Sequence, residues 1–176
     1  MRIIGGEWRS RRLVPPDDAR VRPTADRVRE AWFSILGDGV SGARVADLCA
    51  GSGALGLEAL SRGAATCEFV ELNPRSLAAL RRNVEALGAG PRAIVRRADA
   101  LRVARDAAEG TWDVVLADPP YGLGMGEALA EAWLARPFAP VLAIEHRVDD
   151  PMPAGGDTRR YGETAITFYR VPTSAS

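Results

Sequence analysis

From residue 43 onward, short apolar segments alternate with amphipathic segments, and this pattern constrains the fold more than any other feature of the chain. β-Strands are expected at Arg44–Leu48, Cys67–Glu71, Arg92–Arg97, Trp112–Ala117 and Val141–Ile144. Helices are expected from a glycine turn to about Arg62, from Pro74 to Gly88, from Asp99 to Ala108 and from Gly126 to Arg136. Strands joined through helices form a parallel sheet with right-handed crossovers. The sequence therefore predicts an α/β protein that binds ligands at the carboxyl ends of its strands.

The two ends of the chain break this alternation. Thr158–Tyr161 and Thr164–Arg170 are expected to be strands joined by a turn, which adds an antiparallel hairpin at one edge of the sheet. Near the start, Arg2–Ile4 and Trp8–Val14 predict a short two-stranded ribbon with a glycine turn. A helix is expected over Thr24–Leu36, with its first residue as the N-cap.

Charge is balanced over the whole chain but is uneven along it. The 23 basic residues, all of them arginine, match 23 acidic residues, so the net charge is zero. Residues 1–29, however, contain eight arginines and four acids. We divide the chain into an N-terminal basic extension, residues 1–40, and a ligand-binding domain, residues 41–176. A solvated arginine-rich end is the alternative explanation of the cluster.

Composition argues against several classes of protein. The longest stretch without a charged residue is Leu48–Leu57, about half of what a membrane span needs. We expect no signal peptide, because Glu7 comes before any apolar region. Two cysteines, Cys49 and Cys67, cannot by themselves form a disulfide framework or a zinc site. We therefore expect a cytoplasmic protein without a bound metal.

A glycine turn follows the first expected strand and precedes a helix. Gly51, Gly53 and Gly56 form G-x-G-x-x-G, and Glu71 lies twenty residues after the first of them. Glycines let the backbone approach a ligand, and the helix N-terminus presents free N–H groups to it. This is also the fingerprint of dinucleotide binding, so a nicotinamide-dependent oxidoreductase is one alternative. A glycine turn without a ligand is another.

Asp47, four residues before Gly51, favours a different ligand. A carboxylate at the end of the first strand would repel a pyrophosphate, but it suits a ligand with a cationic amino-acid portion. Residues 44–56 resemble the D-x-x-x-G-x-G pattern of S-adenosylmethionine-dependent methyltransferases. That resemblance implies that S-adenosyl-L-methionine is the cofactor, and that Asp47 lies near its methionine end.

The same resemblance implies the remaining cofactor contacts. Glu71 would accept hydrogen bonds from the ribose hydroxyls, and Asp99 would accept one from the adenine amino group. A strand-end acid and a helix N-cap are the alternative interpretations of these two side chains. The expected cofactor-binding residues are Asp47, Ala50, Gly51, Ser52, Gly53, Glu71, Asp99, Ala100 and Asp118.

A second motif, Asp118-Pro119-Pro120-Tyr121, directly follows the fourth expected strand. The prolines stiffen the loop and leave the Pro119 carbonyl free to face a pocket. Asp118 and this carbonyl can accept the two hydrogens of an exocyclic amino group, while Tyr121 stacks on the base. These hydrogen bonds stabilise the positive charge that develops when the nitrogen attacks a sulfonium methyl group. We expect Asp118, Pro119 and Tyr121 to be catalytic; a simple proline turn is the alternative.

Four segments together point to one family among the methyltransferases. Arg2–Gly6, Arg22–Glu30, Asp47–Arg62 and Asp118–Tyr121 occur in an order that resembles the RsmD-type family of bacterial 16S ribosomal RNA guanine-N2 methyltransferases. The resemblance implies a Rossmann-like class I methyltransferase fold with a mostly parallel seven-stranded sheet. It also implies methylation of the 2-amino group of the guanine at position 966. We expect a monomer that acts on 16S rRNA within the small ribosomal subunit or an assembly intermediate, and not at a membrane.

We expect the basic extension and Tyr121 to bind the RNA. The expected RNA-binding residues are Arg9, Arg11, Arg12, Arg22, Thr24, Arg27 and Tyr121. An adenine-N6 or other amino methyltransferase, and a non-catalytic RNA-binding module, remain alternatives. His146, the sole histidine, is expected in a loop. The side chains of Trp32, Phe33, Cys67 and Trp133 are expected in the core.

Overall fold

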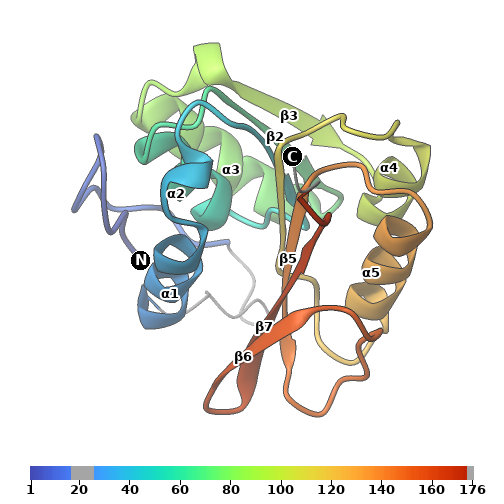
Figure 1. Cartoon of the computed structure of the whole chain (residues 1–176). Helices are drawn as coiled ribbons and strands as arrows, with labels where there is room; N and C mark the ends of the chain where they lie inside the picture. Colours follow the sequence, from blue (N-terminus) through green and yellow to red (C-terminus); the bar gives the residue numbers. More distant parts are fainter. Residues whose placement is uncertain (17–25, 174–176) are drawn as a thin grey trace.

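A computed structural model describes residues 1–16 and 26–173, and a seven-stranded sheet runs through its centre (Figure 1). The strands are β1 (Arg44–Leu48), β2 (Thr66–Glu71), β3 (Ala93–Arg97), β4 (Val114–Ala117), β5 (Val141–Arg147), β6 (Asp157–Tyr161) and β7 (Thr164–Arg170). Their order is β3-β2-β1-β4-β5-β7-β6. β1 to β5 are parallel, and β7 pairs antiparallel with both β5 and β6. The predicted α/β sheet with its C-terminal hairpin is confirmed.

Helices cover both faces of the sheet. They are α1 (Asp26–Leu36), α2 (Ala54–Ser61), α3 (Pro74–Ala86), α4 (Ala100–Asp106) and α5 (Met125–Ala135), with short 3-10 turns at Gly37–Val40 and Gly90–Arg92. α1, α2 and α3 lie on one face, and α4 and α5 lie on the other (Figure 1). Each group buries its own apolar cluster against the sheet, as parallel strands require. The aromatic residues Trp32, Phe33 and Trp133 are buried in these clusters, as predicted.

The start of the chain is less regular than predicted. A single antiparallel bridge joins Arg2 to Arg12, and residues 5–10 form turns instead of a continuous ribbon. The backbone N–H of Trp8 donates to the Ser61 hydroxyl at the end of α2, at 2.9 Å, so it is not used in a strand ladder. Gly6 lies against the same helix end with φ +80°, and a Cβ there would stand 1.9 Å from the Ser61 carbonyl oxygen.

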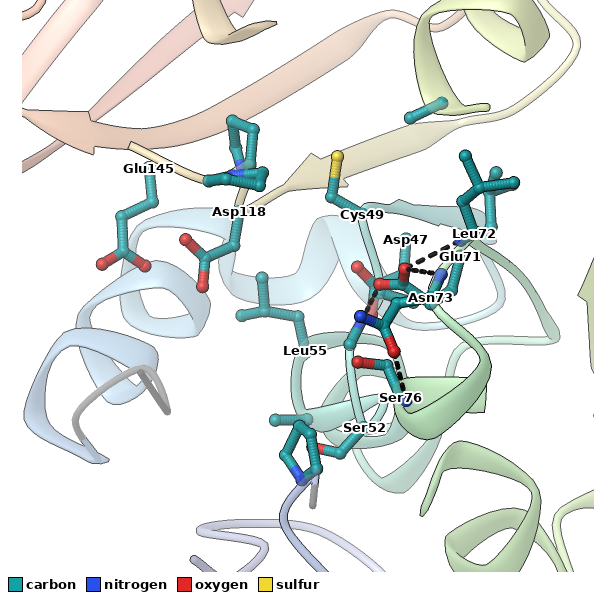
Figure 2. A pocket seen from close by; sticks show the side chains of 18 of the residues that line it. Asp47, Cys49, Ser52, Leu55, Glu71, Leu72, Asn73, Ser76, Asp118 and Glu145 are labelled. Carbon is teal, nitrogen blue, oxygen red and sulfur yellow. Dashed lines mark hydrogen bonds between the residues drawn. The ribbon is translucent and has the colours of Figure 1, made fainter. Parts of the chain in front are cut away.

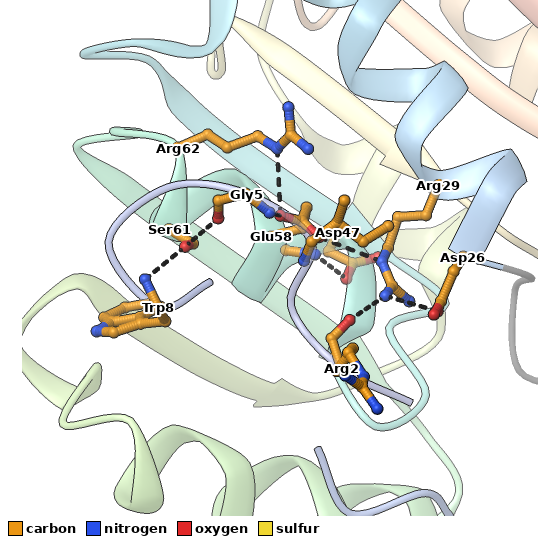
Figure 3. A network of polar contacts seen from close by, with 11 residues as sticks. Arg2, Gly5, Trp8, Asp26, Arg29, Asp47, Glu58, Ser61 and Arg62 are labelled. Atoms are coloured by element: carbon orange, nitrogen blue, oxygen red, sulfur yellow. Dashed lines mark hydrogen bonds and ion pairs between the residues drawn. The ribbon is translucent and has the colours of Figure 1, made fainter. Parts of the chain in front are cut away.

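A buried carboxylate fixes this segment to the main body (Figure 3). Glu58 of α2 accepts the N–H groups of Ile4, at 2.8 Å, and Gly5, at 3.0 Å. It also pairs with the Arg29 guanidinium at 3.3 Å, and both side chains are fully buried. Arg29 donates in turn to the Arg2 carbonyl. Removing one partner from such a buried network costs far more than breaking a surface ion pair.

β5 is longer than the sequence indicated, which corrects the placement of His146. The expected strand ended at Ile144, but pairing with β7 extends it to Arg147. His146 therefore lies within a strand and is 5% exposed, with its Nε2 2.6 Å from the Thr167 hydroxyl. The polar Glu-His-Arg stretch looks like a loop locally, but the ladder to β7 overrides that local preference.

Candidate active site

The strand order creates a crevice between β1 and β4, because the chain leaves these neighbouring strands in opposite directions. A cavity of about 980 Å³ lies there, at the carboxyl ends of β1 to β4. Five acidic side chains line it: Asp47, Glu71, Asp99, Asp118 and Glu145. Figure 2 shows most of these carboxylates arranged around one open space. This volume matches an ordinary ligand pocket.

The loop after β1 forms the floor of the cavity. Gly51 lines it with φ +57°, a conformation that favours glycine, and a Cβ there would meet nothing within 4 Å. Gly53 is buried and does not line the cavity, because its Cα packs towards Leu80 of α3. Gly56 lies in α2, where a Cβ would stand 2.3 Å from the Phe69 ring. Of the three glycines in the fingerprint, Gly51 faces the cavity, and the others permit close packing.

Asp47 is 1% exposed at the end of β1. Its Oδ2 accepts the N–H of Gly56 at 2.9 Å, which satisfies one of the free donors at the start of α2. Its Oδ1 is buried and has no hydrogen-bond partner among the described residues. Burial raises the pKa of this carboxyl well above 3.8, and the charges of Asp118 and Glu71 raise the pKa further. A buried, unpartnered carboxylate oxygen beside a cavity fits a ligand that brings a positive charge.

Glu71 ends β2 with both carboxylate oxygens turned towards backbone donors. Its Oε1 accepts from Gly51 N at 2.8 Å, and its Oε2 accepts from Leu72 N and Asn73 N at 2.7 and 2.8 Å. These bonds fix the carboxylate between the loop after β1 and the start of α3 (Figure 2). A carboxylate offers about four acceptor positions, so capacity for a further donor remains.

The adjoining residues complete this half of the cavity. Asp99 caps α4 by accepting Arg102 N at 3.0 Å, and it also lines the cavity. The helix-cap interpretation is therefore correct for one carboxylate oxygen, without excluding a ligand contact. Ala50, Ser52 and Ala100, which are also predicted to bind the cofactor, line the cavity as well.

The Asp118–Tyr121 loop follows β4 and forms the opposite wall. Asp118, Pro119 and Tyr121 all line the cavity, so the structure brings the three predicted catalytic residues together. The Tyr121 hydroxyl lies 3.3 Å from Glu145 Oε1 and 3.2 Å from Thr164 Oγ1. These bonds hold the phenol in place and leave the ring to form part of the wall.

Sequence reasoning missed several lining residues. Glu145 on β5 and Thr164 on β7 reach the cavity because these strands pair antiparallel, which no local pattern reveals. Cys49 and Met125 also line it, with their sulfur atoms 3.4 Å apart. Burial raises the pKa of the Cys49 thiol, and the nearby acids, Glu71 first, raise it further, so this side chain stays protonated.

The basic extension contributes to the cavity through apolar residues. Met1, Pro16 and Val28 line it, whereas Arg9, Arg12 and Arg27 are exposed elsewhere on the surface. Arg11 is also exposed, and it donates to the Ala86 carbonyl at 2.8 Å. The predicted contacts Arg22 and Thr24 lie outside the described residues.

The described residues contain no group of three or more His, Cys, Asp or Glu side chains placed to hold a metal ion. None of the helices in the described ranges has the length and apolar character needed to cross a bilayer.

Comparisons with known proteins agree with this architecture. Residues 1–170 match the family model described as "Conserved hypothetical protein 95". Ribosomal RNA small subunit methyltransferase D of Escherichia coli strain K12 is 38% identical over 159 residues, which cover 87% of this chain and 78% of that protein. The Haemophilus influenzae protein of the same name is 31% identical, over 97% of this chain and 92% of its own.

A solved structure shares the whole fold. A hypothetical protein of Thermus thermophilus superimposes with a TM-score of 0.83 at 32% identity, covering 97% of this chain and 99% of that one. The predicted resemblance is confirmed: the chain belongs to the family of ribosomal RNA small subunit methyltransferase D.

Proposed function

We propose that this protein transfers a methyl group from S-adenosyl-L-methionine to the N2 amino group of a guanine in 16S rRNA, at position 966. The observation that carries the proposal is the single cavity that unites the strand-end acids with the Asp118–Tyr121 loop. The named relatives are small-subunit ribosomal RNA methyltransferases, which supports the choice of substrate. We further propose that the protein acts as a cytoplasmic monomer on the small subunit or an assembly intermediate.

The described residues fit this cofactor. The buried Asp47 Oδ1, which has no partner among the described residues, suits the positively charged methionine end. Glu71 and Asp99 retain acceptor capacity for the ribose hydroxyls and the adenine amino group. Ala50, Gly51, Ser52 and Ala100 line the space between these acids. When bound, the cofactor supplies an electrophilic methyl group on a sulfonium sulfur.

The residues of this chain then prepare the nucleophile. Asp118 and the Pro119 carbonyl accept the hydrogens of the guanine amino group, and Tyr121 stacks on the base. The cofactor would supply the methyl carbon as the electrophile and would keep the electron pair of the carbon–sulfur bond as a neutral thioether, while the proton lost by the amino nitrogen would pass to the Asp118 carboxylate that accepts its hydrogen bond. Because that nitrogen shares its lone pair with the ring, hydrogen bonds that accommodate its developing charge lower the barrier. The target base must leave its stack to reach this loop, which favours a loop or junction in the RNA.

Nucleoside analysis tests this function. Small subunits from cells that lack the protein would be incubated with the purified protein and methyl-labelled cofactor, and the labelled nucleosides would be identified by mass. We expect N2-methylguanosine at one position, and a decrease of at least about 10²-fold in rate for Asp118→Ala. Label in N6-methyladenosine would favour the adenine alternative, and no label in any RNA would overturn the proposal.

A further inference from the structure

We infer that Glu145 selects guanine by accepting the N1–H hydrogen bond of the base whose amino group is held by Asp118 and Pro119. This inference rests on the proposed function and concerns how the same site distinguishes bases. The loop motif alone accepts hydrogens from any exocyclic amino group, so it does not explain a preference for guanine. A second recognition group has to lie beside it.

Glu145 lies where such a group is needed. It comes from β5, is 4% exposed, and lines the cavity together with Asp118 (Figure 2). In that view, the carboxylates of Glu145 and Asp118 both point into the same open space. Glu145 Oε1 also lies 3.3 Å from the Tyr121 hydroxyl, so its carboxylate stands at the outer end of the ring expected to stack on the base.

The contact with the tyrosine is compatible with a second role for Glu145. The Tyr121 hydroxyl lies 3.3 Å from Glu145 Oε1 and 3.2 Å from the Thr164 hydroxyl. A carboxylate offers about four acceptor positions on its two oxygens, so Glu145 can bind the tyrosine and also accept an N–H from a base in the cavity.

Guanine and adenine differ in the group that stands beside the exocyclic amino group. Guanine presents its N1–H donor directly beside the 2-amino group, so two neighbouring acceptors match that edge. Adenine presents an acceptor nitrogen, N1, beside its 6-amino group, and a carboxylate there repels the lone pair. A site built to accept an N–H bond rejects an analogue that lacks the donor, because its buried acceptor is left unpaired. Glu145 beside Asp118 therefore favours guanine by attraction and disfavours adenine by repulsion.

The unmodified protein provides the first test. Two RNAs would carry either guanine or 2-aminopurine at the target position; 2-aminopurine keeps the 2-amino group but has an acceptor at N1. We expect kcat/KM for 2-aminopurine to be lower by roughly 10²-fold. Equal rates with the two RNAs would overturn the inference while leaving the proposed function intact. Failure to methylate the guanine RNA would instead count against the proposed function.

The variant Glu145→Gln provides the second test, because an amide can donate to N1 as well as accept from N1–H. The guanine preference is the ratio of kcat/KM for the guanine RNA to kcat/KM for the 2-aminopurine RNA. We expect this ratio to be at least about 10-fold smaller for the variant, because methyl transfer to guanine becomes slower and methyl transfer to 2-aminopurine becomes faster. Cofactor affinity and the thermal midpoint check that the variant is folded. If it does not fold, Glu145→Asp, which keeps the charge but shortens the side chain by one methylene, takes its place with the same two RNAs, because 2-aminopurine also lacks the 6-oxo group of guanine and the unmodified protein alone does not separate the two changes.

Matched variants separate recognition from positioning. Tyr121→Phe and Thr164→Val each remove a hydroxyl bond around the phenol but leave the Glu145 carboxylate, so both should retain the guanine preference even where the rate falls. Glu85→Gln, at an exposed position on α3, should match the unmodified protein. If Glu145→Gln slows transfer to both bases equally, as Tyr121→Phe does, Glu145 merely positions the tyrosine and the inference is wrong.

Discussion

At the scale of single residues, Asp47 shows that a residue placed for ligand binding can lower the stability of the folded protein. One carboxylate oxygen serves α2 through Gly56, and the other is buried with no partner among the described residues. Because burial raises the pKa of the folded carboxyl above 3.8, folding favours the protonated form. Stability associated with this group is therefore present below pH 3.8 and is lost as the pH rises through the folded pKa.

Asp47→Asn should consequently stabilise the ligand-free protein. The amide stays neutral, so the variant avoids the penalty of a buried charge. We expect its thermal midpoint at pH 8 to exceed that of the unmodified protein by about 2–4 °C, with the gap narrowing as the pH falls towards about 4. Affinity for S-adenosylmethionine, measured by calorimetry, should fall by about 10-fold or more. A midpoint gap that does not change with pH would contradict the raised pKa.

Several lining residues were predictable because each follows a strand in the sequence. Asp47, Glu71, Asp99 and Asp118 stand at or just after the carboxyl ends of parallel strands, and those ends meet at one edge of a sheet. Glu145 was not predictable in the same way, because its place in the cavity depends on how β7 returns beside β5. Gly53 is predicted to bind the cofactor because a residue without a Cβ lets the backbone approach a ligand, but in the structure the missing Cβ makes room for Leu80.

At the scale of elements, the start of the chain is held by the end of α2. Gly6 makes the close approach to Ser61, and Glu58 binds the two residues before it. As a result, Met1 lines the cavity at the carboxyl ends of β1 to β4. The predicted ribbon is present in part: Ile3 N donates to the Arg11 carbonyl and Leu13 N donates to the Met1 carbonyl, but the N–H groups of Ile4, Gly5 and Trp8 bind side chains of α2 and so cannot extend the ladder.

Gly6→Ala tests this docking, with Gly42→Ala as its control. Both glycines have positive φ, at +80° and +73°, but a Cβ at Gly42 would meet nothing within 4 Å. We expect Gly42→Ala to lower the free energy of unfolding by about 1 kcal/mol. Gly6→Ala should cost about 1–3 kcal/mol more, because its Cβ collides with Ser61. Denaturant unfolding measures both values; equal decreases would show that the close approach is not required.

Most elements were predictable because their local signals agree with the final packing. The strand Arg44–Leu48 and the strand Thr164–Arg170 have the bounds expected from sequence. α3 begins at Pro74, where Asn73 caps it through bonds to Arg75 N and Ser76 N. The difference at β5 comes from long-range pairing, which local propensity does not contain.

At the scale of the whole molecule, the cavity and the N-terminal arginine cluster lie in different places. The cavity lies at the crevice between β1 and β4, whereas Arg9, Arg11 and Arg12 lie on the surface of the extension docked against α2 and α3. A neutral protein attracts RNA weakly at long range, so a local basic cluster would supply the phosphate contacts.

Replacing Arg9, Arg11 and Arg12 together by Ala should weaken rRNA binding and its salt dependence. We expect the slope of log affinity against log salt to fall by roughly one unit for each phosphate that the variant no longer neutralises. The control, Arg102→Ala with Arg105→Ala, removes exposed charges from α4 and should change the slope less. Binding that is unaltered at every salt concentration would mean that the cluster is merely solvated.

The most direct test of the account is a crystal structure of the protein with S-adenosylhomocysteine bound. We predict that the ligand occupies the 980 Å³ cavity, with its ribose at Glu71, its adenine at Asp99 and its sulfur directed towards Asp118. A ligand bound elsewhere on the protein, or a cavity in which Asp118 and Tyr121 cannot reach the sulfur end, would contradict it.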